Sequence, residues 1–165
     1  MSVQDQIRDT ALRYGVDPSI ALAVAKQESG FNQGARGAAG EVGIFQLMPG
    51  TAADLGVNPY SESENIQGGI AYLSQLYRQF GDWAKALAAY NGGPGNMARG
   101  TTPPAAWGYA ETVLDAAMMY QTVQPSGTPQ EPVLASILPS FEGVPQWTWL
   151  AGAGLLAVAL VASRD

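Results

Sequence analysis

Glu28 is the residue of this chain whose position best fits acid/base chemistry. The 165 residues contain no Cys and no His, so thiol nucleophiles, imidazole bases and thiolate or imidazole metal sites are excluded, and no metal or cofactor is expected. Proton transfer is left to carboxylates, Tyr, Lys or water. Glu28 comes one turn after residues 20–25, IALAVA, which are apolar on every face of a helix. A Glu near a helix end is usually a solvated surface residue. Here, burial and the negative end of the helix dipole would both raise its pKa, as a general acid requires.

Two further segments combine polar side chains with turn signals. Residues 43–49, GIFQLMP, place the Gln46 amide inside an apolar run, and residues 89–95, AYNGGPG, end a helical pattern with Tyr90 and Asn91. Taken singly, the first fits an exposed turn and the second an ordinary helix C-cap, since Asn and Gly are common stop signals.

Together these segments resemble the lytic transglycosylase family with the goose-type lysozyme-like fold, the catalytic domain of soluble lytic transglycosylases. The resemblance runs from residue 3 to about residue 120, and the segments agree in order and spacing. They are ESGFN at 28–32, GIFQLMP at 43–49 with TA at 51–52, NI at 65–66, AYL at 71–73, AAYNGGPG at 88–95, and Tyr109 with Val113.

The sequence also departs from the family pattern in the loop after Glu28. Gly37 stands where the family commonly has Ser, and Glu41 where a small residue is common. Gln33 replaces a frequent proline, and the residues before Tyr109 are Ala-Ala-Trp-Gly in place of the usual acidic-threonine pair. These departures concern the cleft wall and Tyr109, and they leave Glu28 unaffected.

The resemblance implies an activity and a set of site residues. The family cleaves the β-1,4 bond between N-acetylmuramic acid and N-acetylglucosamine of peptidoglycan and forms a 1,6-anhydro product. Glu28 would be the single catalytic acid and then the base. The resemblance gives the other positions these roles: Ser29 would position the substrate N-acetyl group or Glu28 itself, Tyr109 would lie near the Glu28 carboxyl, and the cleft would be lined by Gln46, Met48, Tyr90 and Asn91.

Residues 1–121 are expected to form an all-α, lysozyme-like catalytic domain. Ser2 with Asp5 predicts a capping box for a first helix that ends near Gly15, and Asp17-Pro18 begins a second that ends at Gly30. Residues 31–43 predict a loop with a short extended piece, and Pro49 begins a short helix. The remaining helices are predicted from a capping box at Ser61 and Glu64 to residue 80, from Asp82 to a stop at residues 92–95, and from residues 102–103 to about 121.

The end of the chain has a different composition. Residues 122–146 contain five of the eleven prolines and no Lys or Arg, which predicts an extended linker. Residues 147–163 are seventeen uncharged positions, about 25 Å of helix against a hydrocarbon core of about 30 Å. With Trp147 and Trp149 at one end and Arg164 at the other, they predict a transmembrane helix. A helix docked on the domain or on a partner subunit is the alternative.

The net charge and its distribution limit the kinds of partner that the protein is expected to bind. The net charge is −6 and the eight Lys and Arg residues are scattered, so nucleic acid is not an expected partner. The expected partners are peptidoglycan glycan strands and, through residues 147–163, a lipid bilayer. Flanking charge weakly favours a catalytic domain on the periplasmic side.

The N-terminal residues have no apolar run, so no signal peptide is expected. A bacteriophage protein carried on a virion membrane would explain a membrane tether without a signal peptide, with the enzyme opening the cell wall locally during phage entry and other virion proteins as partners. A bacterial secretion or conjugation system is the alternative setting. Two other functions stay open: a lysozyme-like hydrolase, with Glu41 as the nearest candidate for a second carboxylate, and a non-catalytic peptidoglycan-binding membrane protein.

Overall fold

A computed structural model describes residues 1–122 as a helical domain. The helices of this part of the chain, in order, are α1 (Val3–Tyr14), α2 (Pro18–Ser29), α3 (Pro49–Leu55), α4 (Glu62–Phe80), α5 (Trp83–Gly92), α6 (Pro94–Arg99) and α7 (Pro104–Thr122). The predicted linker at 122–146 and the predicted transmembrane helix at 147–163 lie outside the described residues, apart from the backbone of the last helical position. Within residues 1–122, no helix combines the length and the apolar character that crossing a membrane demands.

Local signals set the ends of the first two helices. The Ser2 hydroxyl accepts a hydrogen bond from the Asp5 amide and the Asp5 carboxylate accepts one from the Ser2 amide, so the predicted capping box is confirmed. Asp17 caps α2 through the Ser19 amide at 2.8 Å, and Gly30 ends α2 in the left-handed conformation. Because both ends of α2 are fixed, Glu28 is held in its last turn.

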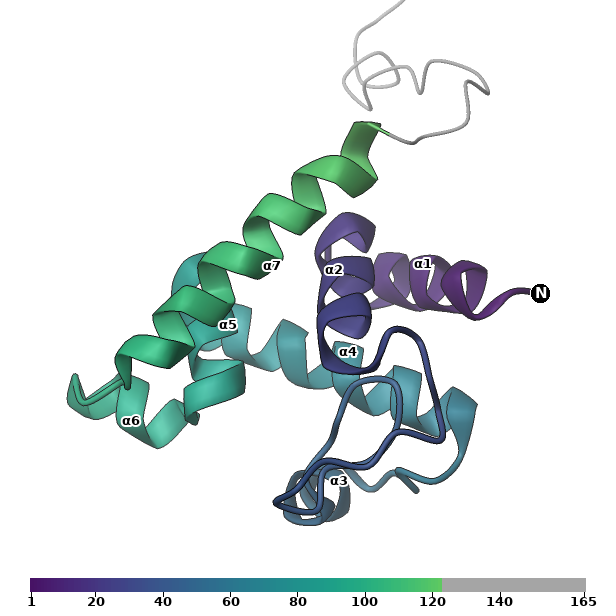
Figure 1. The fold of residues 1–165 in the computed structure, drawn as a ribbon, viewed down its shortest axis with the longest axis horizontal. Helices are drawn as coiled ribbons and strands as arrows, with labels where there is room; N and C mark the ends of the chain where they lie inside the picture. Colours follow the sequence, from purple (N-terminus) through teal and green to yellow (C-terminus); the bar gives the residue numbers. More distant parts are fainter. Residues whose placement is uncertain (123–165) are drawn as a thin grey trace, which may run out of the picture. The chain divides into compact units, whose positions relative to one another are not determined.

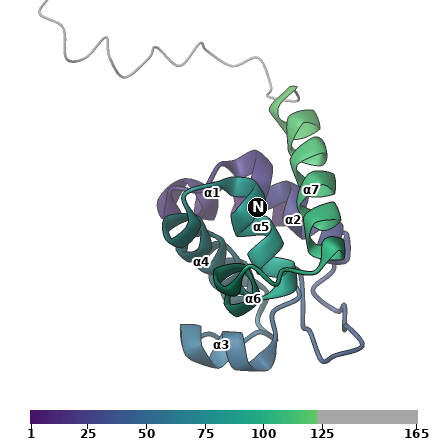
Figure 2. The same cartoon turned by 90° about the vertical axis from the view of Figure 1, so that its left-hand side faces the viewer.

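Helix α2 lies at the centre of the domain. Residues 19–25 are all buried, which an amphipathic surface helix would not allow and which matches the apolar run of the sequence. Helix α1 packs on one part of α2 and α7 on another, with α7 also lying against α5 (Figures 1 and 2). The C-terminal end of α2 therefore lies next to α7 and leads into the loop before α3.

Helix α4 contributes a further part of the core. Ile66, Ile70 and Leu73 are buried at the spacing of one helix face, and the helix predicted from Ser61 to residue 80 is confirmed. A second stripe, with Leu76 buried and Tyr72 half-buried, packs against α5. Helix α4 thus joins the central α2 region to the segment that carries Tyr90.

The loop between α2 and α3 is held by a buried amide. Asn65 is fully buried on α4; its amide nitrogen donates to the carbonyls of Val42 at 2.8 Å and Pro59 at 3.0 Å, and its oxygen accepts from the Phe45 amide at 2.9 Å. Gly43 has φ of 81°, and a Cβ there would lie 2.4 Å from the Asn65 amide nitrogen. Only glycine fits both the conformation and the contact.

Short backbone pairings complete this loop, which passes below the C-terminal end of α2 in Figure 1. Val42 makes isolated antiparallel bridges with Arg36 and with Leu47, so the short extended piece expected from the sequence is present. Gly69 of α4 allows the ring of Phe45 to pack on the helix, because a Cβ at that position would lie within 2.2 Å of the ring.

Two local predictions were wrong. Ser61 begins α4, but its side chain makes no capping hydrogen bond. The Glu64 carboxylate instead accepts from the Asn58 amide at 2.9 Å, because the preceding turn presents that amide to the first turn of the helix. The glycine-rich stop after α5 is also shorter than predicted: Pro94, in the first turn, begins the six-residue α6.

Candidate active site

Glu28 projects from the last turn of α2 and is half-buried. The Tyr109 hydroxyl, from α7, donates a hydrogen bond to its Oε1 at 2.6 Å. The two residues are 81 positions apart in the chain, so this contact depends on α7 packing on α2. The site therefore contains a carboxyl that is partly removed from water and is oriented by a phenol.

Burial raises the pKa of Glu28 above its ordinary value. The hydrogen bond from Tyr109 acts in the opposite direction, because it stabilises the ionised carboxylate, and the negative charge of Glu41 raises the pKa further. The net direction is upward, which keeps the carboxyl protonated to higher pH than a solvated Glu. Such a group can donate a proton and then accept one.

The two phenols near Glu28 remain neutral hydrogen-bonding groups. Burial is the main cause that raises the pKa of Tyr90 and of Tyr109 well above the usual range, and the charge of Glu28 adds to both. The Tyr90 hydroxyl donates to the Phe45 carbonyl at 2.7 Å. Tyr90 therefore anchors the loop from α5, while Tyr109 contacts the carboxyl directly.

A pocket of about 250 Å³ lies beside Tyr90. Its walls combine aromatic rings, amides and a thioether, which suits a sugar with apolar ring faces and polar edges. The lining residues are Gln46, Leu47, Met48, Thr51, Tyr72, Tyr90, Asn91, Gly93 and Pro94. Four positions predicted for the cleft (Gln46, Met48, Tyr90 and Asn91) thus share one pocket, although the loop and α5 that carry them are far apart in sequence.

Gln46 occupies a backbone conformation that few side chains adopt. Its φ is 45°, a left-handed conformation that costs about 1–3 kcal/mol for a residue other than glycine. The side-chain nitrogen donates to the Gly43 carbonyl at 2.7 Å, which holds the turn. Among residues 1–122, the Gln46 side-chain oxygen accepts no hydrogen bond, so it is available to a ligand in the pocket.

Ser29 is placed differently from the other predicted site residues. Its hydroxyl donates to the Ile44 carbonyl at 2.9 Å and accepts from the Asn32 amide at 3.1 Å. These bonds join the end of α2 to the loop. Ser29 therefore positions the segment that surrounds Glu28, and its hydroxyl is already engaged within the protein.

Tyr72 lines the pocket and was not among the predicted site residues. Its ring packs against Tyr90 with centroids 5.4 Å apart, and burial raises its pKa. The signal in the sequence was its position off the main apolar stripe of α4, at i and i+4 with Leu76. That spacing predicts a second packing face, and α5 covers it.

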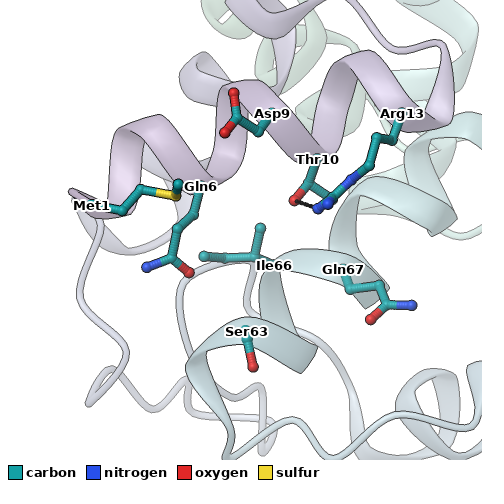
Figure 3. Close-up of a pocket in the computed structure, with 8 residues that line it drawn as sticks. All are labelled: Met1, Gln6, Asp9, Thr10, Arg13, Ser63, Ile66 and Gln67. Carbon is teal, nitrogen blue, oxygen red and sulfur yellow. Dashed lines mark hydrogen bonds between the residues drawn. The ribbon is translucent and has the colours of Figure 1, made fainter.

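A separate hollow of about 210 Å³ lies between α1 and the start of α4 (Figure 3). Gln6, Thr10 and Arg13 line it from α1, and Ser63 and Gln67 line it from α4. It contains none of the predicted site residues. Within the described part of the chain, no cluster of three or more His, Cys, Asp or Glu could hold a metal ion.

Comparison with known proteins identifies the fold that carries this site. The family model described as the transglycosylase SLT domain matches residues 5–103. The chain belongs to this family. A solved structure of an inactive mutant of lytic transglycosylase Slt from Pseudomonas aeruginosa superposes with a TM-score of 0.64 at 29% identity, over 72% of this chain and 24% of the other. The all-α, lysozyme-like SLT fold expected from the sequence is thereby confirmed.

Relatives of this SLT domain occur in a phage and in bacteria. A transglycosylase of Enterobacteria phage PRD1 is 39% identical over 90 residues, which are 54% of this chain and 34% of the phage protein. A soluble lytic murein transglycosylase of Salmonella typhimurium is 38% identical over 94 residues, 50% of this chain and 15% of that protein. This chain thus spans about a third or less of the length of these relatives.

Proposed function

We propose that this chain is a peptidoglycan lytic transglycosylase in which Glu28 is the catalytic acid and then the base. One observation carries the proposal: the Glu28 carboxyl is half-buried, has a raised pKa and accepts a 2.6 Å hydrogen bond from Tyr109. A proton donor with these properties matches what cleavage of a glycosidic bond requires. Membership of the SLT family supports the same reaction.

The reaction uses one carboxyl twice. Glu28 donates its proton to the glycosidic oxygen as the bond from that oxygen to C1 of N-acetylmuramic acid breaks. The substrate N-acetyl group stabilises the positive charge at C1. The Glu28 carboxylate then removes the proton of the C6 hydroxyl, whose oxygen bonds to C1. Glu28 is protonated again, and no water enters the product.

The pocket residues have binding roles in this scheme. Gln46 offers its free amide oxygen and Asn91 its exposed amide, while Tyr90 and Met48 provide the wall against which a sugar ring lies. Tyr109 orients Glu28. These roles explain why polar groups from the loop and from α5 line one pocket.

Replacing Glu28 by Gln tests the proposal. The amide keeps nearly the same shape but cannot donate the proton, so release of anhydromuropeptides from purified sacculi should fall by at least about 100-fold. Glu111→Gln, an exposed carboxylate on α7, is the matched control and should retain activity. Release at the wild-type rate by a folded Glu28→Gln protein would contradict the proposal.

Mass spectrometry of the products separates transglycosylation from hydrolysis. An anhydro product is lighter by one water than the reducing-end product of a lysozyme-like enzyme. We expect the anhydro product. A reducing-end product would instead favour the hydrolase in which Glu41 activates water, and absence of any product would favour a binding protein.

We further propose that residues 147–163 tether the enzyme to a membrane, with the catalytic domain on the periplasmic side or on a virion membrane. The uncharged seventeen-residue segment supports the tether. The phage relative supports local opening of the cell wall as a phage genome enters the host.

Introducing charge into the segment tests the tether. Leu155→Arg with Leu156→Arg should move the full chain from the membrane fraction to the soluble fraction, because central arginines oppose insertion. A matched Leu155→Ala with Leu156→Ala protein should stay with the membrane. Unchanged fractionation of the double Arg variant would contradict the tether.

A further inference from the structure

The backbone of the buried segment 44–45 is paired with side chains from four parts of the fold. Both residues are fully buried, so their amides and carbonyls need partners within the protein. The Ile44 amide donates to Gln33 Oε1 at 3.3 Å, and the Ile44 carbonyl accepts from the Ser29 hydroxyl at 2.9 Å. The same two groups of the next residue are paired with side chains of α4 and α5. Gln33 thus supplies one of the four side-chain contacts that fix this segment.

Gln33 is itself anchored through both polar atoms of its amide. Its nitrogen donates to the Pro59 carbonyl at 2.9 Å, and this carbonyl also accepts from the Asn65 side chain at 3.0 Å. A Cβ built at Gly43 would lie 2.8 Å from Gln33 Oε1, so the glycine leaves room for the amide. The side chain therefore joins the turn before α4 to segment 44–45. The frequent proline that Gln33 replaces has no side-chain donor or acceptor and could form neither bond.

Segment 44–45 leads directly into Gln46, whose backbone conformation needs support. A φ of 45° persists in a residue other than glycine only where the surrounding structure fixes it. The Gln46 amide and its side-chain nitrogen both donate to the Gly43 carbonyl, at 3.2 and 2.7 Å. Segment 44–45 is the chain between these two residues. Contacts that fix the segment therefore also fix Gln46 at the wall of the pocket.

We propose that Gln33 is a positioning residue for glycan binding, which acts through segment 44–45 to hold Gln46 at the wall of the pocket. This rests on the proposed binding role of Gln46. Within the described domain Gln33 is not one of the residues that line the pocket, so it acts by fixing the backbone. Its loss should weaken substrate binding and leave proton transfer unchanged, because Glu28 is held by α2 and by Tyr109.

Gln33→Met in the full chain tests the inference. Methionine is unbranched and of similar length, but it cannot replace the two hydrogen bonds of the amide. With soluble, uncrosslinked glycan strands as the substrate, KM should rise about tenfold and kcat should stay within about twofold of the wild-type value. A wild-type KM in the folded variant would overturn the inference. A fall in kcat at unchanged KM would also overturn it.

Ser74→Ala is the matched control for loss of stability. Ser74 is buried on α4, and its hydroxyl donates to the Tyr14 carbonyl at 2.9 Å, so the substitution also removes a side-chain hydrogen bond to the backbone. This bond joins α4 to the end of α1 and involves no pocket residue. Ser74→Ala should lower Tm and leave KM at the wild-type value. A rise in KM equal to that of Gln33→Met would overturn the inference.

A double variant identifies the residue through which Gln33 acts. Gln46→Ala should itself raise KM by about tenfold or more, because the side chain that binds the glycan is gone. Adding Gln33→Met to Gln46→Ala should then raise KM by no more than about twofold, since the two residues act as one unit. Two full effects that multiply would contradict a shared cause and overturn the inference.

The outcomes separate this inference from the proposed function. A wild-type KM in Gln33→Met, with Glu28→Gln inactive, overturns the inference alone. Activity in folded Glu28→Gln contradicts the proposed function instead. If Gln33→Met does not fold, Gln33→Asn provides the same test with the same expected rise in KM, because its amide is one methylene shorter and cannot reach both the Ile44 amide and the Pro59 carbonyl.

Discussion

The Tyr109 hydroxyl lies 2.6 Å from Glu28 Oε1 and donates a hydrogen bond to it. Tyr109 is on the last helix of the described domain and Glu28 at the end of the central one. The bond stabilises the ionised form of Glu28, while burial and Glu41 favour the protonated form. The state of this one carboxyl therefore depends on groups from two other parts of the chain.

Tyr109→Phe should shift the pH dependence of activity upward. Removing the phenol hydrogen bond raises the pKa of Glu28 further, so the alkaline limb of kcat/KM moves to higher pH. The rate at the optimum should fall about tenfold, since a hydrogen bond to a charged group contributes roughly 1.5 kcal/mol. Anhydromuropeptide release between pH 4 and pH 9 measures both. A limb that moves to lower pH would contradict the role given to this bond.

Glu28→Gln should make the folded domain more stable at neutral pH. The pKa of Glu28 is raised in the folded state, so folding opposes its ionisation, and stability is lost as pH rises through the folded-state pKa. An amide at position 28 carries no such penalty. The variant should have a higher Tm than the wild type at pH 7, with the difference shrinking toward pH 4. A Tm difference that does not change with pH would contradict the linkage.

Gly43→Ala should destabilise the domain more than a glycine substitution with open space around it. Gly43 has φ of 81° and faces the Asn65 amide, whereas Gly56 has φ of 68° with nothing within 4 Å of an added Cβ. Gly56→Ala should cost about 1 kcal/mol through backbone strain alone. Gly43→Ala should cost roughly 1–3 kcal/mol more, because overpacking adds to that strain. If urea unfolding gave the same loss of unfolding free energy for both variants, the Asn65 side chain would be free to move away from the added methyl group.

Asn65→Leu should lower both stability and activity. The substitution removes the side chain that forms hydrogen bonds with the Phe45 amide and with the Val42 and Pro59 carbonyls. These three backbone groups then lose their partner. We expect a loss of about 2–4 kcal/mol in the free energy of unfolding. Gln75→Leu, an exposed position on the same helix, is the control and should cost less than about 0.5 kcal/mol.

Local chemistry made most helix boundaries predictable. The caps at Ser2, Asp17 and Gly30 act within a few residues, so their signals are readable in the sequence. The capping box predicted at Ser61 does not form. The Glu64 carboxylate instead accepts a hydrogen bond from the nearby Asn58 amide, which the preceding turn presents to it. Helix α6 was missed because six residues give too few positions for a periodic pattern.

The site was predictable in its residue types and less so in its geometry. Glu28 could be selected because no His or Cys competes with it and because the helix before it is apolar. The bond from Ser29 to the Ile44 carbonyl joins residues fifteen positions apart. No local pattern in the sequence indicates this bond or the left-handed conformation of Gln46. Tyr72 was overlooked because its partner, Tyr90, lies on another helix.

The position of Tyr109 near the end of the domain has a consequence for synthesis of the protein. A nascent chain that has not yet produced α7 already contains Glu28, the loop and the pocket residues, but it lacks the phenol that orients the carboxyl and the helix that covers α2. We expect such a chain to be unable to cut the wall. If the proposed function holds, cleavage of peptidoglycan would then begin only when almost the whole domain has left the ribosome.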